Sequence, residues 1–148
     1  MVYFDTSVLV AYYCPEPISG QVEKKIRKIK QPAISQLTEV ELVSAISRKI
    51  REKGLSREDG NRVIGRFQSH IKNRLFRWIP VEHQYFQMAK NWISQFNTPL
   101  RTLDALHLAI TSINNLNLFT ADFKLAESAR LFGVEVAMIE NTQHKGRP

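Results

Sequence analysis

The sequence is poor in cysteine and lacks the motifs of several common enzyme classes. Its single cysteine, Cys14, cannot form a disulfide within the chain, which is consistent with a reducing compartment. There is no Gly-rich phosphate loop, so nucleotide hydrolysis of the P-loop kind is not indicated. There is also no G-x-S-x-G elbow to support a serine nucleophile.

Long apolar runs are missing as well. No run approaches the roughly 18 apolar residues that a membrane helix needs. The opening segment MVYFDTSVLVAYY has neither a basic start nor a small-residue cleavage site, and Asp5 interrupts it, so it does not resemble a signal peptide. These features predict a cytoplasmic protein with no membrane segment.

The remaining composition is that of an ordinary globular protein. Hydrophobic residues make up 43% and charged residues 24% of the 148 positions. A chain of this length suits one domain with one substantial core. We expect this domain to occupy residues 1–140 and a polar tail to occupy residues 141–148.

Positive charge is concentrated in the middle of the chain. Residues 24–77 contain 15 basic and 5 acidic residues, whereas the rest contains 6 basic and 9 acidic residues. Such a field attracts polyanions, most often nucleic acid. Charge alone is equally consistent with solvated helix faces.

Short β-type runs alternate with longer helical patterns, which is typical of an α/β domain with a mainly parallel sheet. The predicted strands are residues 2–4, 32–35, 77–81, 116–120 and 134–139. The predicted helices are residues 7–13, 17–29, 37–53, 57–74, 82–96, 102–114 and 122–131. Residues 37–74 thus form a basic helical hairpin.

Four acids are predicted near the beginnings of helices, and three of them come soon after strands. Asp5 follows strand 2–4, Glu41 lies in the first turn after strand 32–35, and Asp122 follows strand 116–120. Asp104 opens helix 102–114. Each position also has a purely structural explanation. Asp5 and Asp122 could be N-caps, Thr38 to Glu41 has the capping-box spacing, and Asp104 could face a helix dipole after a Thr102 cap.

The four acids together point to a metal site. In a parallel α/β sheet, the carboxyl ends of strands share one edge with the amino ends of the following helices, and ligands bind there. Clustered carboxylates repel one another unless a cation lies between them. An all-oxygen donor set without sulfur or clustered histidine suits Mg²⁺ or Mn²⁺ rather than zinc. On a basic protein, this arrangement favours phosphodiester hydrolysis.

At these residues the sequence resembles the PIN domain, and more closely the VapC-type toxins of bacterial toxin-antitoxin modules. Four segments carry the resemblance in the order and spacing of the family: YFDTSVLV, LTEVELVSAISR, LRTLDALHLAIT and LFTADFKLAESARLFGVEV. Together they cover essentially residues 1–139. The resemblance implies a three-layer α/β/α sandwich with a central, mainly parallel five-stranded sheet. It also implies a metal-dependent endoribonuclease.

The resemblance also implies the site residues. By position, the catalytic and metal-binding carboxylates are Asp5, Glu41, Asp104 and Asp122, and the metal is Mg²⁺ or Mn²⁺. Ser7 and Thr120 match hydroxyl positions beside the first and last acids, where they would donate hydrogen bonds. Glu39 competes with Glu41 for its place, and the match to ELVSAI favours Glu41.

The implied partners are an RNA substrate, a cognate VapB-like antitoxin and a second copy of the chain in a homodimer. The hairpin over residues 37–74 could contact either the antitoxin or RNA, and the sequence does not separate the two uses. Unpaired RNA loops are the favoured substrate because their bases can be splayed into a cleft.

Two other functions remain open from sequence. The first is a catalytically inactive PIN-like module that binds RNA or protein, although a module without metal gains nothing from clustered acids. The second is a DNA nuclease of the flap-endonuclease type, which the short chain makes less favourable.

Three further side chains are predicted to be structural. His107 lies three residues after Asp104, and we expect it to be packed or hydrogen-bonded rather than a metal ligand. Trp78 and Trp92 fall within a strand and a helix pattern, so we expect core or interface packing rather than base stacking.

Overall fold

The computed structural model describes residues 1–139, so the predicted tail over residues 141–148 lies outside the described residues. The strands are β1 (Val2–Phe4), β2 (Ala33–Ser35), β3 (Arg77–Ile79), β4 (Asn117–Thr120) and β5 (Val136–Met138). The helices are α1 (Thr6–Tyr13), α2 (Ser19–Ile26), α3 (Gln36–Arg51), α4 (Arg57–Lys72), α5 (His83–Ile93), α6 (Thr102–Ile113) and α7 (Phe123–Leu131). All twelve predicted elements are confirmed within the described part, several with slightly different ends.

The strands form one sheet in the order β3-β2-β1-β4-β5, and every neighbouring pair is parallel. Strand β1 lies in the centre, where Tyr3 is opposite both Ala33 and Leu118. The predicted five-stranded sheet is therefore confirmed, and it is entirely parallel. Because all strands point the same way, their carboxyl ends lie at one edge.

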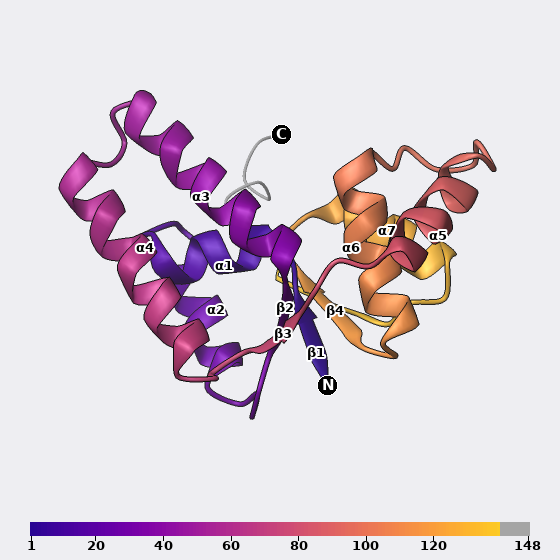
Figure 1. Ribbon diagram of the computed structural model, residues 1–148, viewed down its shortest axis with the longest axis horizontal. Coiled ribbons are helices and arrows are strands. Elements are labelled where there is room, and N and C mark those ends of the chain that lie inside the picture. Colours follow the sequence, from indigo (N-terminus) through magenta and orange to yellow (C-terminus); the bar gives the residue numbers. More distant parts are fainter. Residues whose placement is uncertain (140–148) are drawn as a thin grey trace, which may run out of the picture.

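Helices cover both faces of the sheet, as Figure 1 shows, with α1 to α4 on one side and α5 to α7 on the other. The alternation of side chains along β1 explains the two layers, since neighbouring residues of a strand point to opposite faces. Phe4 belongs to the apolar cluster with α1 to α4, and Tyr3 to the cluster with α5 to α7. Both side chains are fully buried. The predicted three-layer sandwich is confirmed.

The beginnings of the helices correct three predictions. The capping box of α3 is formed by Ser35 and Thr38, not by Thr38 and Glu41, because the strand ends at Ser35 and the helix begins at once. This start places Glu41 in the second turn of α3 rather than the first. In α6 the N-cap is Arg101 without a side-chain bond, so the predicted Thr102 cap is wrong. Asp104 lies in the first turn, as predicted.

The helices α3 and α4 of the hairpin pack closely at Gly60. A Cβ atom at Gly60 would lie 2.6 Å from Ile50 Cδ1 and 3.3 Å from Ile46 Cγ2, both on α3. Gly60 thus allows the close approach that holds α3, and with it Glu41, against the rest of the layer.

No helix among residues 1–139 combines the length and apolarity required to cross a membrane. The two tryptophans differ in their surroundings. Trp92 stacks on Phe132 with ring centres 4.6 Å apart, as its predicted packing requires. Trp78 is 39% exposed on β3, so the prediction of a core position is wrong, and packing at an interface stays a prediction.

Candidate active site

Asp5 lies between β1 and α1, and its carboxylate is almost completely buried, with 5% of the residue exposed. Its Oδ1 accepts hydrogen bonds from Ser7 Oγ at 2.6 Å and the Val8 backbone N–H at 3.3 Å. Its Oδ2 accepts a hydrogen bond from Thr120 Oγ1 at 2.7 Å. Burial raises the pKa of Asp5, and the bonds from Ser7 and Thr120 oppose that rise. Asp5 is therefore both a cap of α1 and a firmly held carboxylate.

The two hydroxyl groups that hold Asp5 also join it to the loop after β4. Ser7 Oγ accepts the Ala121 N–H at 3.2 Å, and Thr120 Oγ1 accepts the Asp122 N–H at 2.9 Å. Since these oxygens accept from backbone N–H groups, their own protons are directed to the carboxylate. Asp5 thereby ties the β1–α1 junction to the β4–α7 junction.

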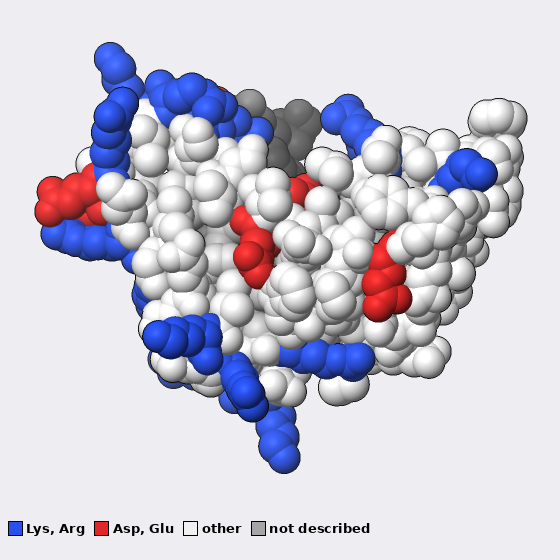
Figure 2. All heavy atoms as spheres, in the orientation of Figure 1, with Lys and Arg blue, Asp and Glu red and all other residues white. Residues whose placement is uncertain are grey.

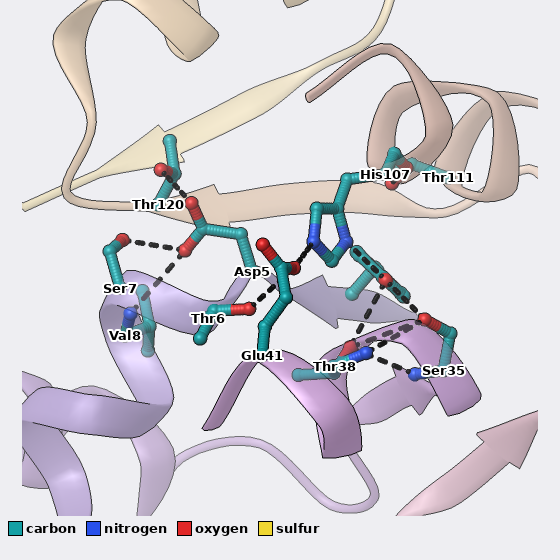
Figure 3. Close-up of polar contacts among 11 residues, drawn as sticks. Asp5, Thr6, Ser7, Val8, Ser35, Thr38, Glu41, His107, Thr111 and Thr120 are labelled. Carbon is teal, nitrogen blue, oxygen red and sulfur yellow. Dashed lines mark hydrogen bonds and ion pairs between the residues drawn. The ribbon is translucent and has the colours of Figure 1, made fainter. Parts of the chain in front are cut away.

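Glu41 reaches the same region from α3. Its Oε1 accepts a hydrogen bond from Thr6 Oγ1 at 2.9 Å and pairs with Nε2 of His107. Burial alone would raise the pKa of Glu41, but the hydrogen bond and charge of His107, together with Thr6, hold it below its ordinary value. Glu41 is therefore ionised near neutral pH. In Figure 3 its carboxylate lies between Asp5 and His107.

The neighbouring acid Glu39 is directed elsewhere. Its Oε1 accepts a hydrogen bond from the Trp78 indole N–H of β3. Residues two apart on a helix point to different faces, so Glu39 faces the edge strand while Glu41 faces His107. The geometry separates the two glutamates in the way the sequence motif suggested.

Asp104 and Asp122 come from the first turn of α6 and the N-cap of α7. Together with Glu41 they line one cavity of about 810 Å³. Burial raises the pKa of Asp104, and the negative charges of Asp122 and Glu41 raise it further, while His107 opposes them. The three carboxylates therefore lie close enough for the charges of Asp122 and Glu41 to act on Asp104.

The structure thus brings together three of the predicted acids at the cavity and places Asp5 in the buried layer next to them. Among residues 1–139, no three His, Cys, Asp or Glu side chains are close enough, as they stand, to hold one metal ion. Several oxygens of Asp5 and Glu41 are taken up by protein donors. The donor set still fits a hard divalent cation, because it is made of carboxylates and a cation would relieve the repulsion at Asp104.

Sequence reasoning did not identify Thr6 or Arg48 as part of this region. Arg48 follows Glu41 by two helical turns, a spacing that places both on one face of α3 and could have revealed it. Arg48 and Glu41 line both the acidic cavity and a second cavity of about 560 Å³, which also includes Lys49 and Arg51. Figure 2 shows Lys and Arg side chains gathered over the part of the molecule formed by α2, α3 and α4.

Comparison with known proteins gives a consistent picture of the fold. The family model for the PIN domain matches residues 2–131. Among proteins with curated functions, none matches the sequence at a significant level.

Three similar solved structures each cover at least 85% of this chain. FitAcB from Neisseria gonorrhoeae is 19% identical, with a TM-score of 0.72 over 97% of this chain and 99% of that chain. A toxin-antitoxin complex from Klebsiella pneumoniae is 17% identical, with a TM-score of 0.64 over 85% and 90%. Mycobacterium tuberculosis VapC20, described as a Sarcin-Ricin loop cleaving toxin, is 14% identical, with a TM-score of 0.69 over 86% and 95%. At these identities the likeness establishes the fold.

Proposed function

This chain belongs to the PIN domain family, and from that premise we propose that it is a divalent-metal-dependent endoribonuclease, the toxin of a VapC-like toxin-antitoxin module. One observation carries the proposal. Glu41, Asp104 and Asp122 line a single cavity at the carboxyl edge of the parallel sheet, and the held carboxylate of Asp5 lies beside it.

The roles of the side chains follow from their surroundings. Asp5, Glu41, Asp104 and Asp122 would hold Mg²⁺ or Mn²⁺, which when bound activates water and neutralises charge on the phosphate. Ser7 and Thr120 keep the Asp5 carboxylate in one orientation. Arg48, at the rim shared by the two cavities, would pair with a phosphate of the bound strand.

RNA is the proposed substrate because the acidic cavity borders α3, which belongs to the basic segment over residues 24–77. The adjoining cavity is lined by three basic and three acidic residues, and one of the basic residues, Lys49, is paired with Glu16. Arg48 and Arg51 make no salt bridge among residues 1–139, and they would hold a polyanion next to the acids. One solved relative is described as cleaving the Sarcin-Ricin loop, and we extend that substrate class, RNA with an exposed loop, to this chain.

The proposal includes two protein partners and a location. A cognate VapB-like antitoxin would hold the enzyme inactive, as the toxin-antitoxin complex among its structural relatives suggests. A homodimer in the cytoplasm is the proposed form of the chain. The hairpin of α3 and α4 would contact either the antitoxin or RNA, and it exposes Val40 and Val43 beside its basic residues.

The function is tested by metal binding and RNA cleavage in the same preparation. We expect the purified protein to bind Mn²⁺ in calorimetry and to cut RNA, with cleavage lost in excess chelator and restored by Mn²⁺. Asp122→Asn should lose both properties and remain folded, because asparagine is also a good N-cap for α7. The matched control is Asp59→Asn in the first turn of α4, outside both cavities, which should leave both properties unchanged.

Two outcomes would contradict the proposal in different ways. Binding of RNA without cleavage at any Mn²⁺ concentration would favour the inactive binding module. Cleavage that survives both the chelator and Asp122→Asn would show that the active site lies elsewhere.

Arg48→Gln should weaken catalysis by removing a phosphate contact. Within the described residues 1–139 Arg48 makes no salt bridge, so its charge is available to the substrate. We expect kcat/KM on an RNA oligonucleotide to fall about tenfold, the effect of losing one charge-assisted hydrogen bond. The control Arg62→Gln removes the same charge from an arginine that is paired with Glu58 and Asp59. Equal losses in the two variants would mean that only net charge matters.

A further inference from the structure

A chain of buried polar contacts runs from the centre of the sheet to the Glu41 carboxylate. The Tyr3 hydroxyl of β1 lies 2.6 Å from Nδ1 of His107 on α6, and Nε2 of His107 pairs with Glu41 Oε1. The Tyr3 hydroxyl also lies 2.8 Å from Ser35 Oγ and 3.2 Å from Thr38 Oγ1. Tyr3 and His107 are both inaccessible to bulk solvent, at 0% and 2% exposed.

The donor and acceptor properties of these groups determine how the hydrogen bonds between them are arranged. The Glu41 carboxylate only accepts hydrogen bonds, so Nε2 of His107 must carry the proton that it shares with Glu41. When the imidazole is neutral, Nδ1 is then an acceptor and the Tyr3 hydroxyl donates to it; when the ring is charged, the Nδ1–H donates to the Tyr3 oxygen. Ser35 and Thr38 can in turn donate to the phenol oxygen, which leaves its proton free for the histidine. In both protonation states the contact with Tyr3 holds the ring in the orientation that presents the Nε2–H to Glu41.

This contact fixes which oxygen of Glu41 is available. Oε1 receives both the His107 N–H and the Thr6 hydroxyl, from opposite layers of the molecule. Figure 3 shows the other carboxylate oxygen turned away from His107, on the side of Asp5. A glutamate held in this way loses little side-chain freedom when it binds a ligand, which increases affinity.

We propose that His107 is a positioning residue: it holds Glu41 by one oxygen so that the other is presented to the divalent metal, and Tyr3 holds His107 in the orientation that does this. The inference rests on the proposed metal-dependent function. It assigns His107 no direct contact with metal or RNA. Ligand side chains whose second atom is hydrogen-bonded in this way commonly depend on that partner for metal affinity.

The two ends of the imidazole can be tested separately. In His107→Gln the amide N–H can lie near the position of Nε2, which keeps the contact with Glu41 but loses the contact with Tyr3. In His107→Asn the amide group can lie near the position of Nδ1, which keeps the contact with Tyr3 but loses the contact with Glu41. A histidine that matters only for packing would make the two variants alike, since both lose the ring.

Mn²⁺ affinity measured by calorimetry is the primary readout, and the protein is the full chain. We expect His107→Asn to weaken Mn²⁺ binding about 10- to 100-fold and His107→Gln to restore it to within about threefold of the wild type. Tyr3→Phe should lie between them, because it removes the hydroxyl and leaves the imidazole in place. In RNA cleavage, kcat measured at a fixed low Mn²⁺ concentration should follow the same order, while KM for RNA stays constant.

The result that would overturn the inference is equal Mn²⁺ affinity in wild type, His107→Asn and Tyr3→Phe. If His107→Asn fails to fold, Thr6→Val decides, because it removes the other donor to Oε1 from a partly exposed position. That variant should also weaken Mn²⁺ binding, and unchanged affinity would count against the inference. Failure of the function itself looks different: the wild type would then bind no Mn²⁺ and cut no RNA.

Discussion

Replacing Asp104 by asparagine is expected to lower RNA cleavage by a factor on the order of 10² to 10³, the range found when one preorganised group that stabilises the transition state is removed. The side chain keeps its shape and loses only its charge. Asp104 is half-buried at the acidic cavity, and its pKa is raised by burial and by Asp122 and Glu41. A metal bound there would lose one of its charged ligands.

The same substitution should make the metal-free protein more stable at neutral pH. A carboxyl group whose pKa is higher in the folded than in the unfolded state destabilises the fold once both states are ionised. Asp104→Asn removes that cost, so its melting temperature in chelator should exceed that of the wild type. The difference in melting temperature should shrink as the pH falls through the raised pKa of Asp104 in the folded state toward the ordinary pKa of an aspartate. In that range the wild-type carboxyl group becomes protonated and, like the asparagine, carries no charge.

Cleavage assays in Mn²⁺ and thermal melts in chelator at neutral and acidic pH check both parts. Asp59→Asn is the control, since Asp59 lies on the exposed face of α4 and is paired with Arg62. Full cleavage by Asp104→Asn would remove this residue from the proposed site. A lower melting temperature of the variant at neutral pH would show that burial and the neighbouring charges at Asp104 do not destabilise the fold.

The sequence predicts the fold well because each strand carries its own signal. The runs VYF and NLFT are short and have a β-type composition, and an acid that begins a helix follows each of them within two residues, so element type and strand direction can be derived together. The parallel sheet then brings the acids to one edge by topology alone. This is why the position of these acids at one edge of the sheet could be predicted without a structure.

The register of Glu41 could not be derived in the same way. Ser35 is both the last residue of β2 and the N-cap of α3, so the helix begins directly after the strand. From sequence, Thr38 is an equally good cap. The choice is made by tertiary contacts, since Tyr3 bonds to both Ser35 and Thr38 and holds the junction in place.

The contact between Tyr3 and His107 is harder still to predict. The two residues are 104 positions apart, and each has an adequate local role, one as an apolar strand residue and the other as a buried helix residue. Only the packing of α6 on the sheet shows that their polar atoms meet. The contacts of Tyr3, His107 and Glu41 depend on the relative positions of β1, α6 and α3. No periodic pattern in the sequence indicates them.

Asp5→Ala should have the opposite effect on stability to Asp104→Asn, although both should strongly reduce cleavage. Asp5 caps α1 by accepting the Val8 N–H, and its carboxylate accepts hydrogen bonds from the hydroxyl groups of Ser7 and Thr120. Loss of an N-cap costs about 0.5–2 kcal/mol, and hydroxyls left without an acceptor in a buried site cost about 1–3 kcal/mol. Relief of the buried charge offsets part of this, so we expect a net loss of about 2 kcal/mol in the free energy of unfolding.

Chemical denaturation of the metal-free protein measures this loss, and Ser56→Ala separates its two causes. Ser56 caps α4 at an exposed position with one bond to the Asp59 N–H, so its removal should cost about 1 kcal/mol, the cap contribution alone. A loss at Asp5 no larger than that at Ser56 would mean that the bonds from Ser7 and Thr120 add nothing to stability. A larger loss would show that the carboxylate joins the β1–α1 and β4–α7 junctions, so that one side chain serves both the fold and the acidic cavity.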